Sequence, residues 1–276
     1  MSEVSDQYYS DFLRSFDKAV AEAIRVSQAA AGRKAEPRAW WASVLFTRLC
    51  TFSVSLLSLV PGSRFAPKHF EHFDCASALS LCRNIVDAYF VFFYLCIDAV
   101  SVDEWKYRLT LLQLHDCVTR MTMFREFDPA DDSLDGFELQ ATELRNELAT
   151  LAPFRALPEK QQRHRLKGDT AIYLSQNELL ERMEVERGNF RGLYRFLSAH
   201  VHTLPLGFYR MAERNQGRGI ESDTEKGYIG LALEVAEATL RRATAEMLTV
   251  FPDIGKARSP EEGDRRSERF ANPGKR

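Results

Sequence analysis

The stretch from Ala76 to Val100 constrains the fold more than any other part of the sequence. It reads ASALSLCRNIVDAYFVFFYLCIDAV, which is long, apolar and rich in aromatic residues. A helical segment of this kind belongs at the centre of a large core. A second apolar stretch, from Trp40 to Val60, has Arg48 as its only charge. Because this charge and several Ser and Thr residues interrupt it, we expect a buried helix there and no membrane span.

Helical periodicity and helix-end signals account for the rest of the chain. Ser175 to Glu178 and Ser222 to Glu225 both match capping boxes, in which a Ser hydroxyl and a Glu carboxylate satisfy helix amides. No stretch alternates apolar and polar residues as a strand would. The predicted helices are Asp6–Ala31, Pro37–Val60, Pro67–Val100, Asp103–Phe127, Leu134–Leu151, Ser175–Arg187, Gly188–His202 and Ser222–Phe251.

These elements predict an all-α bundle of about seven to eight helices. We expect one domain over residues 1–252, followed by a disordered charged tail at 253–276. The segment 153–170 is basic and contains prolines and a glycine, so we expect a loop with at most one helical turn. A division into two domains near this loop is the alternative.

Composition limits the classes of function. The 276 residues are 45% apolar, which is ample for a large core, and the net charge is −2. No general attraction to nucleic acid or to anionic membranes follows, so an anionic ligand would need a local basic patch. The N-terminal sequence has no apolar core typical of a signal peptide. The odd number of cysteines, all in apolar segments, fits reduced thiols in the cytoplasm.

The segment from Gly188 to Pro205 carries the most distinctive chemical pattern. On a helix with about 100° per residue, two stripes separate. The apolar stripe consists of Phe190, Leu193, Leu197, Val201 and Leu204. The opposite stripe consists of Arg191, Arg195, Ser198 and His202. Because a helix buried on one face requires only the apolar stripe, the polar stripe is the candidate functional surface.

Two histidines follow Arg195 near the end of this predicted helix. On an ideal wheel His202 lies within about 20° of Arg195, whereas His200 lies about 140° away. A histidine on an apolar face is usually a satisfied core residue, so His202 is the better candidate. Both are retained, because Pro205 lies close by and winding near a helix end departs from the ideal.

Arg83 and Asp87 lie one helical turn apart within the central apolar stretch. One interpretation is an internal ion pair, because an unpaired buried charge is expensive. The other places the pair against Ser198 and His202, where Asp87 would fix the imidazole tautomer as the carboxylate of a catalytic triad does.

No motif in the sequence predicts a metal or a cofactor. His69 and His72 have helical i, i+3 spacing, but structural zinc usually takes four ligands and no third or fourth follows from the sequence. Ser198 does not lie in a Gly-x-Ser-x-Gly turn, and no Gly-rich phosphate-binding loop occurs.

The pairing of Arg195 with a histidine late in an all-helical chain resembles the Arg-x4-6-His signature of the HEPN superfamily. This superfamily includes many bacterial toxin and antiviral ribonucleases. The residue after the arginine is commonly polar in HEPN nucleases, and here it is Phe196.

A closer resemblance is to a family of bacterial helical proteins of unknown function with a Tyr-x3-Ser-x3-His element. Tyr194, Ser198 and His202 match this element, and Arg83-x3-Asp87 matches an early Arg-x3-Glu in which the acid is shortened. The resemblance covers roughly residues 40 to 245.

The resemblance implies metal-independent cleavage of RNA at a cleft where two sites meet in a homodimer. His202, with His200 as its alternative, would act as base or acid, and Arg195 would bind the phosphate. Ser198 would orient either group. The supporting residues would be Tyr194, Arg191, Arg187, Arg83 and Asp87.

The same resemblance implies a toxin with a role in antiphage defence and with an antitoxin or other regulatory protein as partner. The rival hypothesis is a non-catalytic helical module that binds a partner protein or a small anion, with the polar stripe serving structure. The two differ in what they require: the nuclease needs Arg195 and His202 exposed in a cleft, near Arg83 and near the two-fold axis of a dimer, and it fails if both are sealed inside a monomer.

Overall fold

The all-α prediction is confirmed by a computed structural model of the chain, which describes residues 3–128, 133–214 and 217–256. These residues contain twelve α-helices and one π-helical segment, and no strand occurs among them beyond an isolated bridge between Phe73 and Gly219. The helices absent from the sequence prediction are α6, α7, α10 and α12, all short. Contacts divide the chain into two compact units. One, the bundle unit, comprises residues 1–97 and 186–276, and the other, the insert unit, comprises Asp98–Val185.

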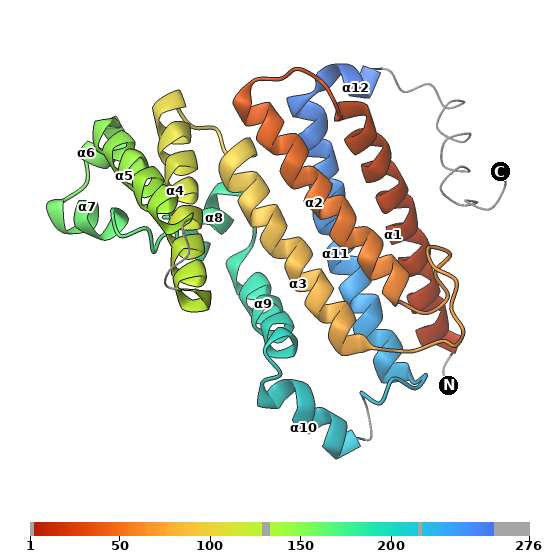
Figure 1. The fold of residues 1–276 in the computed structure, drawn as a ribbon. Coiled ribbons are helices and arrows are strands. Elements are labelled where there is room, and N and C mark those ends of the chain that lie inside the picture. The colour runs from red at the N-terminus through yellow and green to blue at the C-terminus, as the bar shows by residue number, and fades with distance from the viewer. Residues whose placement is uncertain (1–2, 129–132, 215–216, 257–276) are drawn as a thin grey trace. The chain divides into compact units, whose positions relative to one another are not determined.

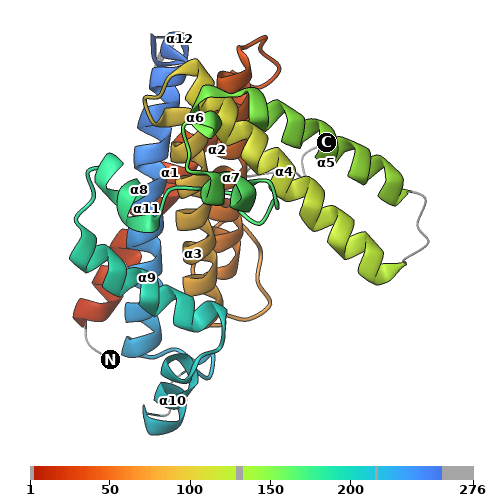
Figure 2. The same cartoon turned by 90° about the vertical axis from the view of Figure 1, so that its left-hand side faces the viewer.

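Four long helices form the bundle unit: α1 (Glu3–Ala30), α2 (Pro37–Leu59), α3 (Cys75–Phe92) and α11 (Asp223–Val250). They lie side by side in both views (Figures 1 and 2). Each contributes fully buried side chains, among them Phe16, Phe46, Phe92 and Leu233. The apolar stretch that the sequence placed at the centre is α3 with its π-helical continuation η1 (Phe93–Ile97), which contacts α2, α9 and α11. Helix α3 is therefore, together with α11, a central helix of the bundle unit.

Helix α2 is buried on one face only. Phe46 and Leu49 on its inner face are completely buried, whereas Trp40 and Val44 are 51% and 40% exposed. By length and composition alone, α2 and the segment Cys75–Ile97 could each cross a membrane, and 39% and 56% of their apolar windows are buried. The core helices of soluble proteins pass the same test, so this finding is weak support for a membrane location. The predicted burial of α2 is right for one face and wrong for the other.

The third helix begins at Cys75 and not near Pro67. Its N-cap is Asp74, whose carboxylate accepts a hydrogen bond from the Ser77 amide at 3.0 Å. Just before it, the Phe73 amide donates to the Gly219 carbonyl oxygen at 3.0 Å, which holds the preceding chain in a non-helical conformation. His69 and His72 consequently lie in a loop, without the helical spacing that the sequence suggested.

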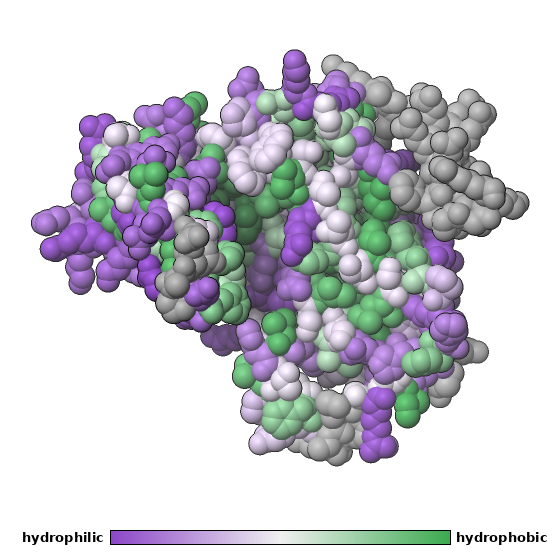
Figure 3. Space-filling model, viewed as in Figure 1, coloured by the Kyte–Doolittle hydropathy of each residue, from purple (hydrophilic) through white to green (hydrophobic). Residues whose placement is uncertain are grey.

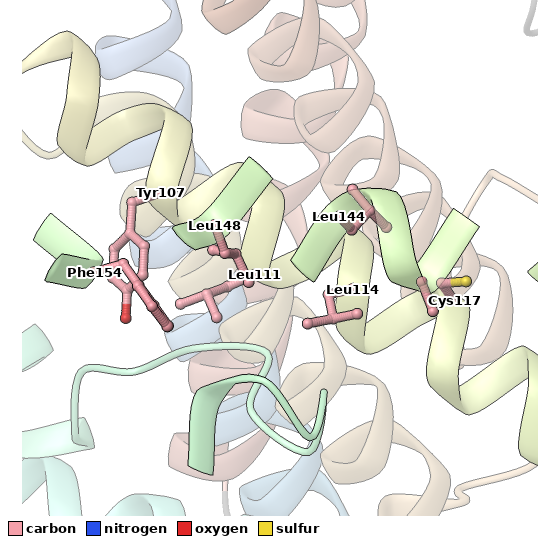
Figure 4. Packing of buried hydrophobic residues seen from close by; sticks show 8 residues of the cluster. Tyr107, Leu111, Leu114, Cys117, Leu144, Leu148 and Phe154 are labelled. Carbon is pink, nitrogen blue, oxygen red and sulfur yellow. The ribbon is translucent and has the colours of Figure 1, made fainter. Parts of the chain in front are cut away.

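The insert unit is built on a pair of packed helices, α4 (Val102–Phe127) and α5 (Ser133–Thr150). Their facing residues form the cluster in Figure 4, which Phe154 of α6 (Ala152–Arg155) completes. The short helices α7 (Glu159–Arg165) and α8 (Gln176–Arg182) follow. Residues 153–170, predicted as a loop, thus include most of α6 and all of α7, each introduced by a proline near its first turn.

Arg108 of the insert unit is completely buried and lies beside two carboxylates. Its guanidinium contacts Asp98 at 2.7 Å and Glu104 at 3.0 Å. Arg182 also contacts Asp98 at 2.8 Å, and the Tyr173 hydroxyl donates to Glu104. Burial acts to lower the pKa of Arg108, but the hydrogen bonds to the two carboxylates outweigh it and the net pKa is raised. This cluster is a closed set of ion pairs.

The predicted capping boxes lie where helices begin. Ser175 and Glu178 form the complete reciprocal pair at the start of α8. At α11, the Ser222 hydroxyl accepts from the Glu225 amide at 3.2 Å, while the Glu225 carboxylate accepts from the Gly217 amide at 2.5 Å. Helix α8 ends at Arg182, earlier than predicted, because Glu184 has a positive φ of 55°.

The C-terminal prediction is only partly covered by the structure. Residues 253–256, assigned to the disordered tail, belong to helix α12 (Pro252–Lys256), where Ile254 is buried. The remainder of the predicted tail, 257–276, lies outside the described residues. The single domain over 1–252 stays a prediction.

All five cysteines are free and buried. Burial raises the pKa of Cys50, Cys82 and Cys96 to about 12. These thiols are therefore protonated and serve as small core residues, as the sequence indicated.

Candidate functional site

The candidate site is built on α9 (Arg187–Val201), which packs on α3. Glu186 caps its N-terminus by accepting hydrogen bonds from the amides of Gly188 and Asn189 at 2.6 and 2.8 Å. An aromatic cluster joins the two helices: the ring of Phe90 lies 5.5 Å from that of Phe190 and 6.2 Å from that of Tyr194. The sequence put Tyr194 among the supporting residues, and in the structure it faces α3.

Arg83 links α3 to α9 through two contacts. Its guanidinium lies 3.5 Å from the centre of the Tyr194 ring, and its Nε donates to the Ser198 hydroxyl at 3.3 Å. It also forms an ion pair with Asp87. Tyr194 closes the network, because its hydroxyl donates to Asp87 Oδ1 at 3.1 Å. We call these four residues the Arg83 cluster.

The Arg83 cluster contains the ion pair that the sequence predicted and places Arg83 against Ser198, as the second interpretation expected. Asp87 contacts a guanidinium and a phenol, and no contact between Asp87 and His202 occurs in the described chain. Ser198 was placed with Arg195 on the polar stripe, yet it faces Arg83 and donates to the Tyr194 carbonyl oxygen at 2.7 Å. Burial lowers the pKa of Arg83. Its side chain is 13% exposed and that of Asp87 46%.

The outward side of α9 is basic. Arg187, Arg191 and Arg195 are exposed, and so is His202, the C-cap residue. Within the described part of the chain, the side chains of Arg191, Arg195 and His202 have no hydrogen-bond or ion-pair partner. Exposure, one of the requirements of the nuclease hypothesis, is therefore present, while the cleft and the dimer axis stay predictions.

His200 has a different environment from His202. Its ring lies 5.0 Å from that of Phe196 and 6.4 Å from that of Tyr228, and it is half-buried. Burial lowers its pKa, so the neutral imidazole is favoured. Phe196, which takes the position after Arg195, also packs on Tyr228 at 5.5 Å. His200 belongs to this aromatic contact and His202 to the open surface.

The chain turns sharply directly after His202. Thr203 has a positive φ of 49°, which a β-branched residue rarely adopts. The Leu204 amide donates to the Ala199 carbonyl oxygen at 2.9 Å and the Thr203 amide to that of His200 at 3.4 Å, the pattern of a Schellman motif. This position usually holds glycine, so the backbone beside His202 is strained.

After the turn, α10 (Pro205–Arg214) packs its first turn on the end of α9. A Cβ added at Gly207 would lie 3.2 Å from the Ala199 carbonyl oxygen. The residues around this junction expose apolar and aromatic surface, part of it visible at the lower edge of Figure 3. The exposed members are Val201 (39%), Leu204 (49%), Leu206 (48%), Phe208 (40%) and Tyr209 (58%).

The exposure of Val201 and Leu204 contradicts their predicted place on the buried stripe. The wheel assumed one helix continuing to Pro205, whereas α9 ends at Val201 and Thr203 redirects the chain. The available signal was Pro205 itself, since proline favours the first turn of a new helix. Sequence reasoning thereby missed Phe208 and Tyr209.

Metal-ligating side chains do not gather in the part of the chain that the structure describes. No group of three or more His, Cys, Asp or Glu residues there could hold a metal ion.

Residues 39–220 match the model of a family of unknown function, DUF5677. The chain belongs to the DUF5677 family. No curated protein and no solved structure matches it. The matched region includes both the Arg83 cluster and His202, and it ends before α11, whereas the resemblance in the sequence was expected to reach about residue 245. Membership in this DUF5677 family carries no known activity.

Proposed function

We propose that this protein is a HEPN-like, metal-independent endoribonuclease centred on Arg195 and His202. The observation that supports this best is the division of α9 into two sides. Tyr194 and Ser198 are bonded to Arg83 on α3, while Arg195 and His202 are exposed with no side-chain partner in the described chain. The Arg83 cluster fixes the rotation of α9, and the two outward groups are left to meet a ligand.

The proposed chemistry needs a base and a cation. The neutral imidazole of His202 accepts the proton of a ribose 2′-hydroxyl, whose oxygen attacks the adjacent phosphorus. The bond from phosphorus to the 5′ oxygen of the next nucleotide breaks, and that oxygen takes up a proton. The products are a 2′,3′-cyclic phosphate and a 5′-hydroxyl end. The Arg195 guanidinium binds the phosphate oxygens, on which charge increases in the transition state.

A second copy of the chain would complete the site. Arg195 and His202 lie seven residues apart, which is about 10 Å along a helix at a rise of about 1.5 Å per residue. One helix offers a single exposed imidazole, so the proton donor to the leaving oxygen is proposed to be His202 of the other protomer of a homodimer. Arg191 and Arg187 extend the basic surface along the RNA, and His200 is assigned to packing.

The proposal includes a cellular role and a location. The resemblance to HEPN proteins supports a cytoplasmic toxin that acts in antiphage defence and is restrained by an antitoxin or another regulatory protein. Five buried, protonated thiols support a reducing compartment.

A second candidate function is a non-catalytic module that binds a partner protein or small anion through the same arginines. Phe196 favours it, because the position after Arg195 holds an aromatic ring packed on His200 and Tyr228. No polar group from that position is available to assist catalysis.

The deciding experiment incubates purified protein with an end-labelled single-stranded RNA in the presence of EDTA. We expect cleavage, with cyclic phosphate ends, that falls at least about 100-fold in His202→Ala and Arg195→Ala. Exposed residues of α7 supply matched controls, His164→Ala and Arg163→Ala, which should cleave as the wild type does. Induced expression in bacteria should arrest growth and fragment total RNA only when His202 is intact.

Undiminished cleavage by His202→Ala would overturn the assignment of the base. Absence of cleavage, combined with anion or protein binding that Arg195→Ala abolishes, would establish the binding module instead.

A further inference from the structure

The junction of α9 and α10 exposes a surface that the reaction above leaves unused. Tyr209 is 58% exposed and Phe208 40%, and their rings contact each other edge to face at 4.7 Å. Leu204 and Leu206 are exposed beside them. Helix α10 has no contacts of comparable extent with any helix other than α9. We call Leu204, Leu206, Phe208 and Tyr209 the elbow surface.

Charge indicates what covers the elbow surface. From Arg187 to Ala212 the sequence contains four arginines and two histidines and no aspartate or glutamate. The whole chain has a net charge of −2, and the exposed Arg187, Arg191 and Arg195 give α9 a local basic surface. A polyanion is the complementary occupant. Among polyanions, nucleic acid also presents flat apolar rings, which match exposed aromatic side chains.

We propose that Phe208 and Tyr209 stack on unpaired bases of a single-stranded RNA whose phosphates bind Arg191 and Arg195. This inference rests on the proposed ribonuclease and names its substrate class. Bases within an A-form duplex are stacked on each other and inaccessible to side chains, so a duplex gains nothing from the elbow surface. The aromatic pair thus selects unpaired RNA.

The position of the elbow surface fits this role. Phe208 follows His202 by six positions, which limits the distance between their Cα atoms to about 20 Å even for an extended chain. The Schellman turn and the packing of Gly207 on Ala199 shorten it further. The stacked bases would therefore lie a few nucleotides from the bond that His202 attacks.

The test measures binding and not cleavage, using the full chain with His202→Ala to prevent turnover. The probes are a labelled oligo(A) of about 12 nucleotides, an abasic ribose-phosphate strand of equal length, an RNA duplex, and vesicles containing phosphatidylserine. We expect oligo(A) to bind about 5- to 100-fold more tightly than the abasic strand, the range of base–aromatic stacking. The double change Phe208→Ala with Tyr209→Ala should remove this advantage and leave abasic binding unchanged.

Controls separate stacking from general apolar contact. Tyr209→Phe retains a ring and should bind as its parent does, and Leu206→Ala removes a comparably exposed aliphatic side chain without loss. Circular dichroism of each variant should show unchanged helix content, and sedimentation should show an unchanged oligomeric state.

Three results would overturn the inference: equal binding of oligo(A) and the abasic strand, equal loss in Leu206→Ala, or vesicle binding that requires Phe208 and Tyr209. A dimer that dissociates in the double variant would assign the elbow surface to a second copy. Cleavage assays distinguish this failure from that of the ribonuclease. If the wild type cleaves RNA and replacing Phe208 and Tyr209 has no effect on binding, only the stacking proposal is rejected. If binding depends on the bases but no cleavage occurs, only the ribonuclease proposal is rejected.

Discussion

Each unit of the molecule contains one well-buried arginine with a carboxylate partner, and the two are satisfied to different degrees. Arg108 in the insert unit is completely buried and contacts both Asp98 and Glu104, which together raise its pKa. Arg83 in the bundle unit is 13% exposed, stacks on a tyrosine ring and has one carboxylate partner that is half exposed. Its pKa is lowered by burial.

The difference shows where the molecule retains unfavourable features. Around Arg108 every charge has an opposite charge beside it, as expected of a group that only stabilises a fold. The region around Arg83 contains an under-neutralised arginine, a threonine with positive φ, exposed arginines and a half-buried histidine. Such features gather at functional sites, where the surrounding structure holds them in place. The following predictions test this contrast, from the largest expected effect to the smallest.

Replacing Arg108 should have the greatest effect on stability. Arg108→Met leaves the Glu104 carboxylate without its cation and Asp98 with Arg182 alone, so we expect a loss of about 3–5 kcal/mol in the free energy of unfolding. Urea denaturation followed by circular dichroism measures it. The control is Arg125→Met, which lies on α4 as Arg108 does and breaks the exposed pair with Glu138 of α5. It should lose less than about 1 kcal/mol of unfolding free energy. Similar losses of unfolding free energy in Arg108→Met and Arg125→Met would show that the buried ion pairs of Arg108 contribute no more than an exposed pair.

Replacing Arg83 should destabilise the protein less. Arg83→Met removes one stacking contact and the bond to Ser198, for which we expect about 1–3 kcal/mol by the same denaturation assay. Arg83→Lys keeps the charge without the planar group and should fall between this variant and the wild type. A loss as large as that of Arg108→Met would mean that the Arg83 cluster is an ordinary structural pair.

Relieving the strained turn beside His202 should raise the stability of the folded protein. Thr203→Gly relieves a positive φ that costs roughly 1–2 kcal/mol in a non-glycine residue, partly offset by the entropy of glycine in the unfolded chain. We expect a net gain of about 0.5–1 kcal/mol and a higher melting temperature. Glu184→Gly, at the corresponding position after α8, is unbranched and should gain less. An equal or larger gain at Glu184 would remove the argument that strain concentrates at α9.

His200 should produce a small dependence of stability on pH. Because burial lowers its pKa in the folded state, the unfolded chain binds a proton more readily below its ordinary pKa of about 6.5. Stability should therefore fall as the pH decreases through and below about 6.5, and His200→Gln should flatten this part of the curve. Melting temperatures of both proteins between about pH 5 and 8 provide the measurement. Parallel curves would show that His200 is solvated in the folded protein.

Much of the helical architecture was predictable because its signals are local. Pro37, Ser175 and Ser222 fix helix starts through the chemistry of their own or neighbouring amides. The start of α3 at its N-cap Asp74 was not predicted, because the helix was expected to begin near Pro67. The intervening residues form a loop that the hydrogen bond between Phe73 and Gly219 holds. That partner is distant in sequence, so no window around Pro67 could reveal it.

The candidate site was predictable in its residue types and less so in its orientation. A helical wheel places Arg195 and His202 on one line, and the structure exposes both. Ser198 lies at the edge of that line and faces inward, where it contacts Arg83. Because Arg83 is 115 positions away in the sequence, the wheel could not show this contact. Tyr194 and Asp87, 107 positions apart, meet for the same reason.

The sequence by itself determined an all-α fold, the central role of the Ala76–Val100 stretch and the alignment of Arg195 with His202. These depend on periodicity and end signals, which act over one or two helical turns. Only the tertiary structure decided which side of α9 rests on α3, and that the chain turns outward at Thr203 to expose Phe208 and Tyr209. The physical reason is that periodicity gives the angles between side chains on one helix, whereas packing against a distant helix sets how that helix is rotated.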